Sequence, residues 1–121
     1  MKGQDIEDRL VLFGIRIVNL CDSLSESRAR NHIAAQLLRS GTAPAAHYAE
    51  ARNAESNKDF VHKMRLALKE LNESRIWLLI LMGSNLVPAD KLQPLHQECE
   101  ALCRIFGASV ATAKGRGTTK K

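Results

Sequence analysis

Three residues in the last third of the chain have types and spacing that could hold a metal ion. His96, Cys99 and Cys103 stand at positions i, i+3 and i+7, so a helix would carry them on one face. Cys21 could approach them from another helix. A closed zinc site needs four ligands, however, and only one helix clearly offers them. Free cysteines usually fill a core as small apolar side chains, so the sequence predicts no metal site and no cofactor.

A second group of polar residues could form a carboxylate centre between helices. It consists of Glu50, Glu55, Glu70 and Glu73 with His47 and His62. Di-metal bundles use Glu-x-x-His pairs that face inward, and no such pair occurs in residues 28–83. Surface pairing is the simpler interpretation, for example Glu73 with Lys69 four residues before it. No P-loop, dinucleotide fingerprint, HExxH motif or Ser-His-Asp arrangement is present, so we predict no enzyme and no small-molecule substrate.

A third group is basic and could bind phosphates. The net charge is +5, and residues 28–75 and 114–121 each carry a net +4 while the rest of the chain carries −3. Five acidic residues are interleaved with the central basic ones, so the simpler interpretation is a solvated face. Aromatic residues make up only 4%, so any nucleic-acid contact would be directed at the backbone rather than at stacked bases. The candidates are Arg28, Arg30, Arg39, Arg52, Lys58, Lys63, Arg65, Lys69, Arg75, Lys114 and Arg116.

Apolar residues recur with helical spacing in four segments that would position these groups. The sequence predicts helices at about 5–24, 28–53, 57–83 and 88–113. Asp5 is the expected N-cap of the first helix. Ser56 with Asp59 three residues later resembles a capping box, and Gly83-Ser84-Asn85 is a stop signal. Pro88 can occupy the first turn of the fourth helix.

Pro44 interrupts the second predicted helix. It has no N–H to donate to the Ser40 carbonyl, and its ring crowds that carbonyl. One interpretation ends a helix at Gly41 and starts another at Pro44. The other keeps one long helix that is kinked near Pro44. The segment from Ala34 to Ala49 is apolar on most faces, so this helix has apolar surface to spare, which predicts self-association.

The chain of 121 residues is long enough for one domain with a single core. Four amphipathic helices with short connections predict an all-α, antiparallel up-down-up-down four-helix bundle over residues 1–113. Residues 114–121 contain two glycines and no apolar residue, so they are predicted to form a disordered basic tail. No apolar run could span a membrane, and the N-terminus lacks a signal core. Three cysteines without a framework fit a reducing compartment, so we expect a cytoplasmic protein.

Residues 36–81 resemble the bacterial four-helix-bundle family first noticed as 23S rRNA intervening-sequence proteins. The matching points are Arg39-Ser40-Gly41-Thr42, Tyr48-Ala49-Glu50-Ala51, Glu55-Ser56, Lys58-Asp59-Phe60, Ala67-Leu68-Lys69-Glu70, and Glu73-Ser74-Arg75 before Trp77-Leu78. Two positions depart from the family pattern: His47 stands where Asn is usual, and Ala43 where Ser is frequent. The rest of the chain agrees with the family in helix pattern and length.

This resemblance implies a continuous, bent second helix through Pro44 and a ring-shaped homo-oligomer, often a pentamer. The accessory protein of diversity-generating retroelements is similar in fold, and there the basic ring surface implies nucleic acid and reverse transcriptase as partners. In a ring each charge repeats around the axis, so modest patches would join into a band.

We therefore predict a binding or scaffold protein that forms a cyclic homo-oligomer, with five chains favoured, and that binds DNA or RNA through phosphates. The alternative is a purely structural assembly without a nucleic-acid role. The position of the central basic residues separates the two. A band on one surface favours nucleic acid, and dispersal among acidic residues favours the structural alternative.

Overall fold

The computed structural model describes the backbone of residues 2–118 and the side chains of residues 3–115. It contains four helices, α1 (Lys2–Ser23), α2 (Arg28–Arg52), α3 (Asn57–Gly83) and α4 (Ala89–Thr118), and no strand occurs in residues 2–118. α2 packs against α1 and α3, and α4 packs mainly against α3. The predicted all-α four-helix bundle is confirmed. Among the described residues, none of the helices has the length and apolarity needed to cross a membrane.

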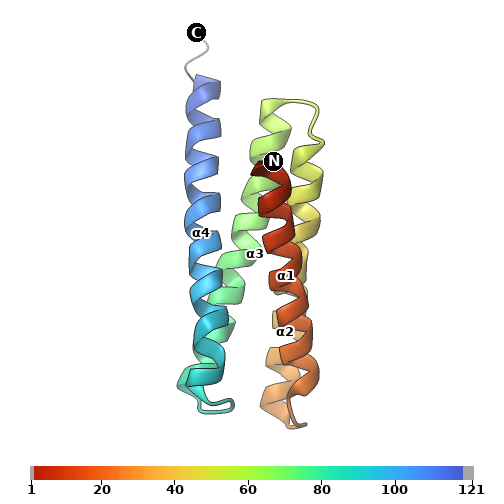
Figure 1. The fold of residues 1–121 in the computed structure, drawn as a ribbon, viewed down its shortest axis with the longest axis vertical. Coiled ribbons are helices and arrows are strands. Elements are labelled where there is room, and N and C mark those ends of the chain that lie inside the picture. The colour runs from red at the N-terminus through yellow and green to blue at the C-terminus, as the bar shows by residue number, and fades with distance from the viewer. Residues whose placement is uncertain (1, 119–121) are drawn as a thin grey trace.

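Figure 1 shows the chain running down α1, up α2, down α3 and up α4, so the α1–α2 and α3–α4 connections both lie at the lower end. α1 and α3 are diagonal neighbours, and their backbones do not approach each other closely within the described residues. α1 and α4 touch at few positions, and one bidentate ion pair joins them. Nε and Nη2 of Arg9 donate to the two carboxylate oxygens of Glu98 at 3.1 and 2.8 Å.

Serine hydroxyls fix the starts of α2 and α3. Ser27 accepts a hydrogen bond from the backbone N–H of Arg30, and Ser56 accepts one from the backbone N–H of Asp59, each at 3.0 Å. Each bond satisfies a backbone donor that has no partner inside the helix. The N-cap predicted at Ser56 is confirmed.

The end of α3 agrees with the sequence prediction, whereas the start of α1 differs from it. α3 ends at Gly83, where the stop signal predicts it, and Asn85 has a φ of 59°, the left-handed conformation that terminates helices. The first helix, by contrast, begins at Lys2, so the expected N-cap at Asp5 is wrong. Asp5 lies in the first turn, where its charge still interacts favourably with the helix dipole.

α2 is one continuous helix through Pro44, which decides between the two interpretations of this segment. Close packing on α1 accounts for the continuity. A Cβ added to Gly41 would stand 2.7 Å from Cγ1 of Ile17, so α1 approaches α2 as closely as glycine allows, one turn before the proline. This packing offsets the hydrogen bond that Pro44 cannot donate. A bend at Pro44 stays a prediction.

The apolar stripes of the four helices meet in one core. Its fully buried large side chains include Leu10, Phe13, Ile17, Leu37, Leu71, Leu78, Leu81, Leu92, Leu102 and Phe106. Two serines interrupt this pattern at fully buried positions. The hydroxyl of Ser74 on α3 donates to Oγ of Ser40 on α2 at 2.8 Å, so these polar groups satisfy each other between the helices.

α4 runs to Thr118, five residues beyond the predicted end of the last helix. Residues 114–118 of the predicted disordered tail are therefore helical, and residues 119–121 lie outside the described part of the chain. Extending an existing helix adds one hydrogen bond for each residue that is fixed. Basic residues in its last turns also interact favourably with the negative end of the dipole.

Candidate functional site

Most of the central basic residues fall into two groups, and the first group is engaged within the bundle. Nη1 of Arg39 on α2 donates to Glu70 on α3 at 2.9 Å, and its Nη2 forms an ion pair with Glu73. Glu73 also accepts a hydrogen bond from Nε1 of Trp77 at 3.0 Å. The predicted pairing of Glu73 with Lys69 along α3 is wrong, because Arg39 reaches Glu73 from the adjacent helix.

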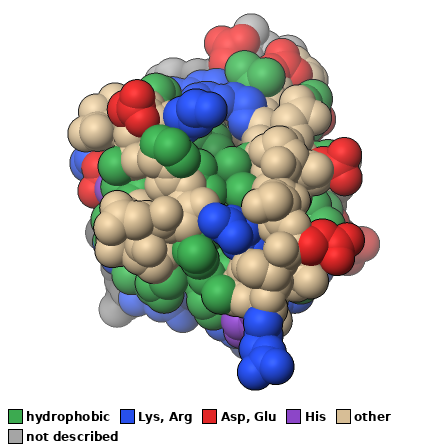
Figure 2. Space-filling view, turned by 90° about the horizontal axis from the view of Figure 1, so that it is seen from below, with side chains coloured by type: hydrophobic (Ala, Val, Ile, Leu, Met, Phe, Trp, Pro, Cys, Tyr) green, Lys and Arg blue, Asp and Glu red, His purple; other side chains and the backbone are tan. Residues whose placement is uncertain are grey.

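Three more basic candidates join other parts of the chain. Arg30 donates to the carbonyl of Leu86 at 3.3 and 3.1 Å, Arg52 pairs with Glu7 at 2.9 Å, and Lys63 pairs with Glu50 at 3.0 Å. The bond from Lys63 lowers the pKa of Glu50. The Arg30 contact holds the α3–α4 connection to the start of α2. At this end of the bundle, Figure 2 shows basic and hydrophobic side chains in the middle and both acidic and basic ones at the edge.

The second group is exposed on α3. We call Lys58, His62, Arg65 and Lys69 the basic stripe, because they are exposed and recur at helical spacing along one face of α3. Among the described residues, none of the four has an acidic partner within 4.0 Å. Three of them also line a shallow hollow with Val61.

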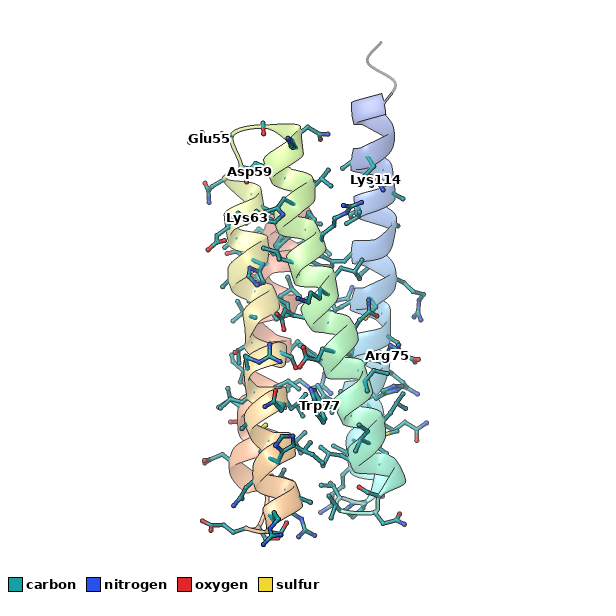
Figure 3. The ribbon with its side chains drawn as sticks, turned by 180° about the vertical axis from the view of Figure 1, so that it is seen from behind. Glu55, Asp59, Lys63, Arg75, Trp77 and Lys114 are labelled. Atoms are coloured by element: carbon teal, nitrogen blue, oxygen red, sulfur yellow. The ribbon has the colours of Figure 1, made fainter. Side chains whose placement is uncertain are left out.

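The remaining candidates lie apart from each other. Arg28 is exposed at the first residue of α2. Lys114 is exposed near the end of α4, and the side-chain amide of Asn57 donates to the carbonyl of Ala113 at 3.1 Å, so Lys114 lies at the same end of the bundle as the start of α3. Figure 3 shows Lys114 on α4 at this end. The side chain of Arg116 lies outside the described residues.

Arg75, the last candidate, is half-buried beside two cysteines of α4. Cys99 is fully buried and donates to the carbonyl of Leu71 at 3.2 Å, as expected of a core residue. A hydrogen bond with Cys103, together with burial, raises the pKa of Cys99. The same bond lowers the pKa of Cys103, and the charge of Arg75 acts in the same direction. Within the described residues no three histidine, cysteine or acidic side chains gather as metal ligands would.

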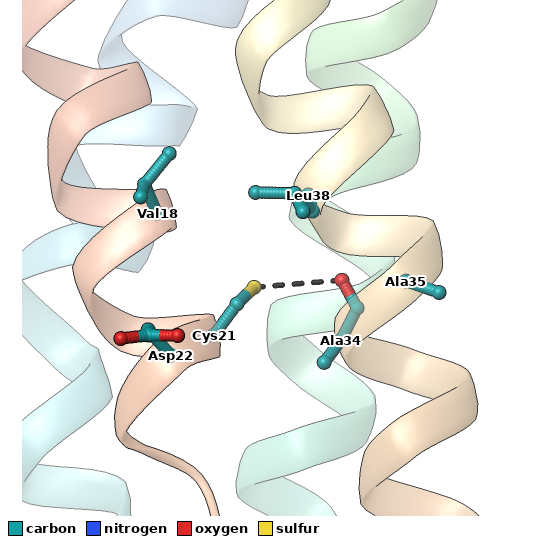
Figure 4. Close-up of a pocket in the computed structure, with 6 residues that line it drawn as sticks. All are labelled: Val18, Cys21, Asp22, Ala34, Ala35 and Leu38. Carbon is teal, nitrogen blue, oxygen red and sulfur yellow. Dashed lines mark hydrogen bonds between the residues drawn. The ribbon is translucent and has the colours of Figure 1, made fainter.

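Cys21 on α1 stands apart from the other cysteines. Its Sγ lies 3.5 Å from the carbonyl of Ala34 on α2, and burial raises the pKa of this thiol to about 11. Figure 4 shows it in a small hollow between α1 and α2, with Val18 and Leu38 on the rim. The sequence left open that Cys21 approaches His96, Cys99 and Cys103, and no such cluster is found among the described residues.

Exposed hydrophobic side chains form the other unusual surface. The large ones in the described part are Val11, Leu12, Ile15 and Val18 on α1, Leu38 on α2, and Ile76, Leu79 and Ile80 on α3. The sequence predicts that the surplus of apolar surface lies on the second helix. The surplus lies instead on α1 and α3, because α2 is covered on two sides and its exposed apolar residues are mostly alanines.

The residues that carry the family resemblance hold α2 in place. Arg39 binds α3 through its two glutamates, Ser40 bonds to Ser74, and Gly41 admits Ile17 of α1. Tyr48 packs edge-on against Phe106 of α4 with ring centroids 5.4 Å apart. These positions are explained by packing and helix pairing rather than by a reaction. The family motif marks these positions in the sequence, but only the structure shows which residues they contact.

These features define a four-helix bundle held by polar contacts between helices and carrying exposed apolar and basic faces. The chain belongs to the family of 23S rRNA-intervening sequence proteins, whose pattern matches residues 5–108. It is similar to a protein of unknown function from the S23 ribosomal protein family of Bacteroides thetaiotaomicron, known from a crystal structure. The two share 30% sequence identity and a TM-score of 0.84, over 92% of this chain and 99% of that chain. No curated protein matches the chain.

Proposed function

We propose that this protein is a self-assembling scaffold whose copies join into a cyclic homo-oligomer, with five copies favoured. Its role is one of binding rather than catalysis. The observation that carries the proposal is the group of eight large hydrophobic residues exposed on the described chain. Neighbouring exposed apolar side chains, such as Val11, Ile15 and Val18 on α1, mark interaction sites.

The shape of the α1 surface supports the same role. Val11, Ile15 and Val18 rim an apolar hollow of about 310 Å³, whose floor includes Gly14 and Ala45. The small residues let α1 and α2 approach closely and leave room above them for a side chain from another molecule. Helices commonly dock in such grooves through residues spaced one turn apart.

Light scattering tests the proposal directly. The wild-type chain of 13.4 kDa is expected to have a mass that is a multiple of this value at micromolar concentration. Leu12→Glu with Ile15→Glu should shift the mass toward a single chain, because two charges would have to be buried in an apolar contact. The control is Gln97→Glu with Ala111→Glu, which adds the same charge at exposed positions of α4. A wild-type protein of single-chain mass would refute the proposal.

A second candidate function is binding of DNA or RNA through phosphates. The basic stripe of α3 favours it, because its members lack acidic partners in the described chain whereas Arg39, Arg52 and Lys63 have them. Such binding would be weakly sequence-selective, since lysine and arginine contacts to phosphates read no base edges. The purely structural alternative is supported by the basic residues that are used in ion pairs within the chain.

A further inference from the structure

The exposed apolar residues form two separate faces on opposite sides of the bundle. The α1 face carries Leu12 and Ile15, which are 56% and 50% exposed, and the α3 face carries Ile76 and Ile80, which are 44% and 42% exposed. α1 lies at the front in Figure 1, and α3 lies at the front in Figure 3, which is seen from behind. One face alone could pair with itself in a two-fold dimer, but the other face would then stay uncovered. Two different faces suit a head-to-tail contact.

Both faces have a charged half, and the charges are opposite in sign. Toward its start, the exposed side of α1 carries Asp5 and Asp8. Toward its start, the exposed side of α3 carries the basic stripe, with Arg65 and Lys69 nearest the apolar residues. The half of each face toward the start of its helix is therefore charged, and the other half carries the large apolar residues, with exposed Asp22 beside Val18 near the end of α1. Opposite charges in matching halves are what complementary surfaces require.

The two faces also agree in register along the bundle. α1 and α3 run in the same direction and end at the same end of the molecule (Figure 1). Asp5 and Arg65 each lie 18 residues before the last residue of their helices, Ser23 and Gly83.

Two other pairs of residues lie at nearly matching distances from the ends of their helices. Asp8 and Lys69 lie 15 and 14 residues before these ends, and Ile15 and Ile76 lie 8 and 7 residues before them. One residue of mismatch corresponds to about 1.5 Å along a helix. A rotation about an axis parallel to the bundle preserves these levels, so it would bring acidic groups to basic groups and apolar groups to apolar groups.

We propose that the α3 face of one copy docks on the α1 face of the next copy, with the helices parallel. Ile76, Leu79 and Ile80 cover the apolar hollow of α1, while Arg65 and Lys69 meet Asp5 and Asp8. The apolar half contributes most of the free energy, because exposed ion pairs contribute little on their own. The charged half fixes the register and disfavours other arrangements. This inference rests on the proposed self-assembly and specifies which surfaces make it.

The inference changes the role of two nucleic-acid candidates. In the proposed assembly, Arg65 and Lys69 contact the neighbouring copy and are covered by it. Lys58, near the start of α3, and Lys114, near the end of α4, stay outside this contact.

A charge-exchange experiment tests the pairing. Arg65→Glu with Lys69→Glu, and separately Asp5→Lys with Asp8→Lys, should each lower the mass measured by light scattering at micromolar concentration, because like charges would then face each other across the contact. The four changes combined should restore the wild-type mass, because the attraction returns with exchanged signs. The matched control is Lys91→Glu with Arg104→Glu, which reverses two exposed charges on α4 and should leave the mass unchanged. Circular dichroism verifies that every variant is helical.

The outcomes separate this inference from the proposal on which it depends. A wild-type protein of single-chain mass overturns both. A wild-type assembly that neither charge reversal disturbs overturns the α1–α3 contact but leaves self-assembly intact. Loss of assembly in both reversals without restoration in the combination overturns the specific pairing of these charges.

Discussion

At the scale of single residues, buried polar groups pair across α2 and α3. Ser40 and Ser74 are both fully buried, and their hydroxyls lie 2.8 Å apart. Removing one hydroxyl leaves the other without this partner, whereas removing both removes the need for it. The effects of the two substitutions should therefore not add.

We expect Ser40→Ala to lower the free energy of unfolding by about 1–3 kcal/mol, because the buried hydroxyl of Ser74 would lose its acceptor. Ser40→Ala combined with Ser74→Ala should be less destabilising than the sum of the single changes. Urea denaturation measures all three variants, and Ser25→Ala in the exposed α1–α2 connection serves as the control. Additive effects would show that the two hydroxyls do not interact.

Two cysteine thiols should differ in reactivity, because their surroundings shift their pKa values in opposite directions. Burial raises the pKa of Cys21 to about 11, while hydrogen bonding between the two neighbouring thiols of α4 lowers the pKa of the half-buried Cys103. The thiolate is the reactive form, so a lowered pKa supplies it at lower pH and a raised pKa delays it.

Alkylation with iodoacetamide between pH 7 and pH 9, followed by mass spectrometry, should therefore modify Cys103 well before Cys21. The rate at Cys21 should still be rising at pH 9, because that pH is below its pKa. Cys103→Ser should remove the fast modification. Equal rates at the two thiols throughout this range would contradict the assignment.

At the scale of helices, one glycine lies in a close contact between two helices and another lies at an open position. A Cβ at Gly41 would lie 2.7 Å from Ile17, whereas a Cβ at Gly107 in α4 would have no neighbour within 4 Å. Gly41→Ala should destabilise the fold by about 1–3 kcal/mol, as overpacking does. Gly107→Ala should stabilise it by up to about 1 kcal/mol through helix propensity. Thermal denaturation compares the two.

Ile17→Ala supplies the control for this pair. The side-chain atoms nearest to the added Cβ are Cγ1 and Cγ2 of Ile17, and alanine lacks both. Against an Ile17→Ala background, Gly41→Ala should therefore destabilise much less than it does alone. The same loss in both backgrounds would mean that this contact is not what requires glycine.

Sequence patterns predicted most of the helices because their causes are local. Ser56 caps α3 through a neighbouring N–H, and the stop after Gly83 needs only the next two residues. The partners of Arg39 were not predicted, because Glu70 and Glu73 reach it only when α2 and α3 pack. The exposure of Ile15 was missed for the same reason, since helical periodicity cannot show which part of a wide apolar stripe faces the core.

At the scale of the whole molecule, the proposed assembly would place its remaining positive charge at one end. Lys58 and Lys114 lie at the end opposite the α1–α2 connection, and residues 114–121 carry four basic groups in the sequence. Rotation around the axis of a ring would repeat these groups along one rim. Phosphate binding, if the assembly has it, should therefore depend on this rim rather than on Arg65 and Lys69.

Any nucleic acid bound at this rim should be held through its phosphates. Deletion of residues 114–121 together with Lys58→Glu should weaken binding to every DNA or RNA sequence about equally, because these charges would contact phosphates rather than bases. The dependence of log affinity on log salt should become shallower by up to about 0.9 for each phosphate that the protein no longer neutralises.

Gel-shift titrations at several salt concentrations measure both effects, and light scattering should show an unchanged assembly. Lys91→Glu with Arg104→Glu lowers the net charge by 4, against 6 for the rim variant, and shows how much of the loss follows from net charge alone. Binding that survives the rim variant but disappears when Arg65 and Lys69 are reversed in an intact assembly would place the nucleic acid on the α3 face and contradict both the rim and the α1–α3 contact.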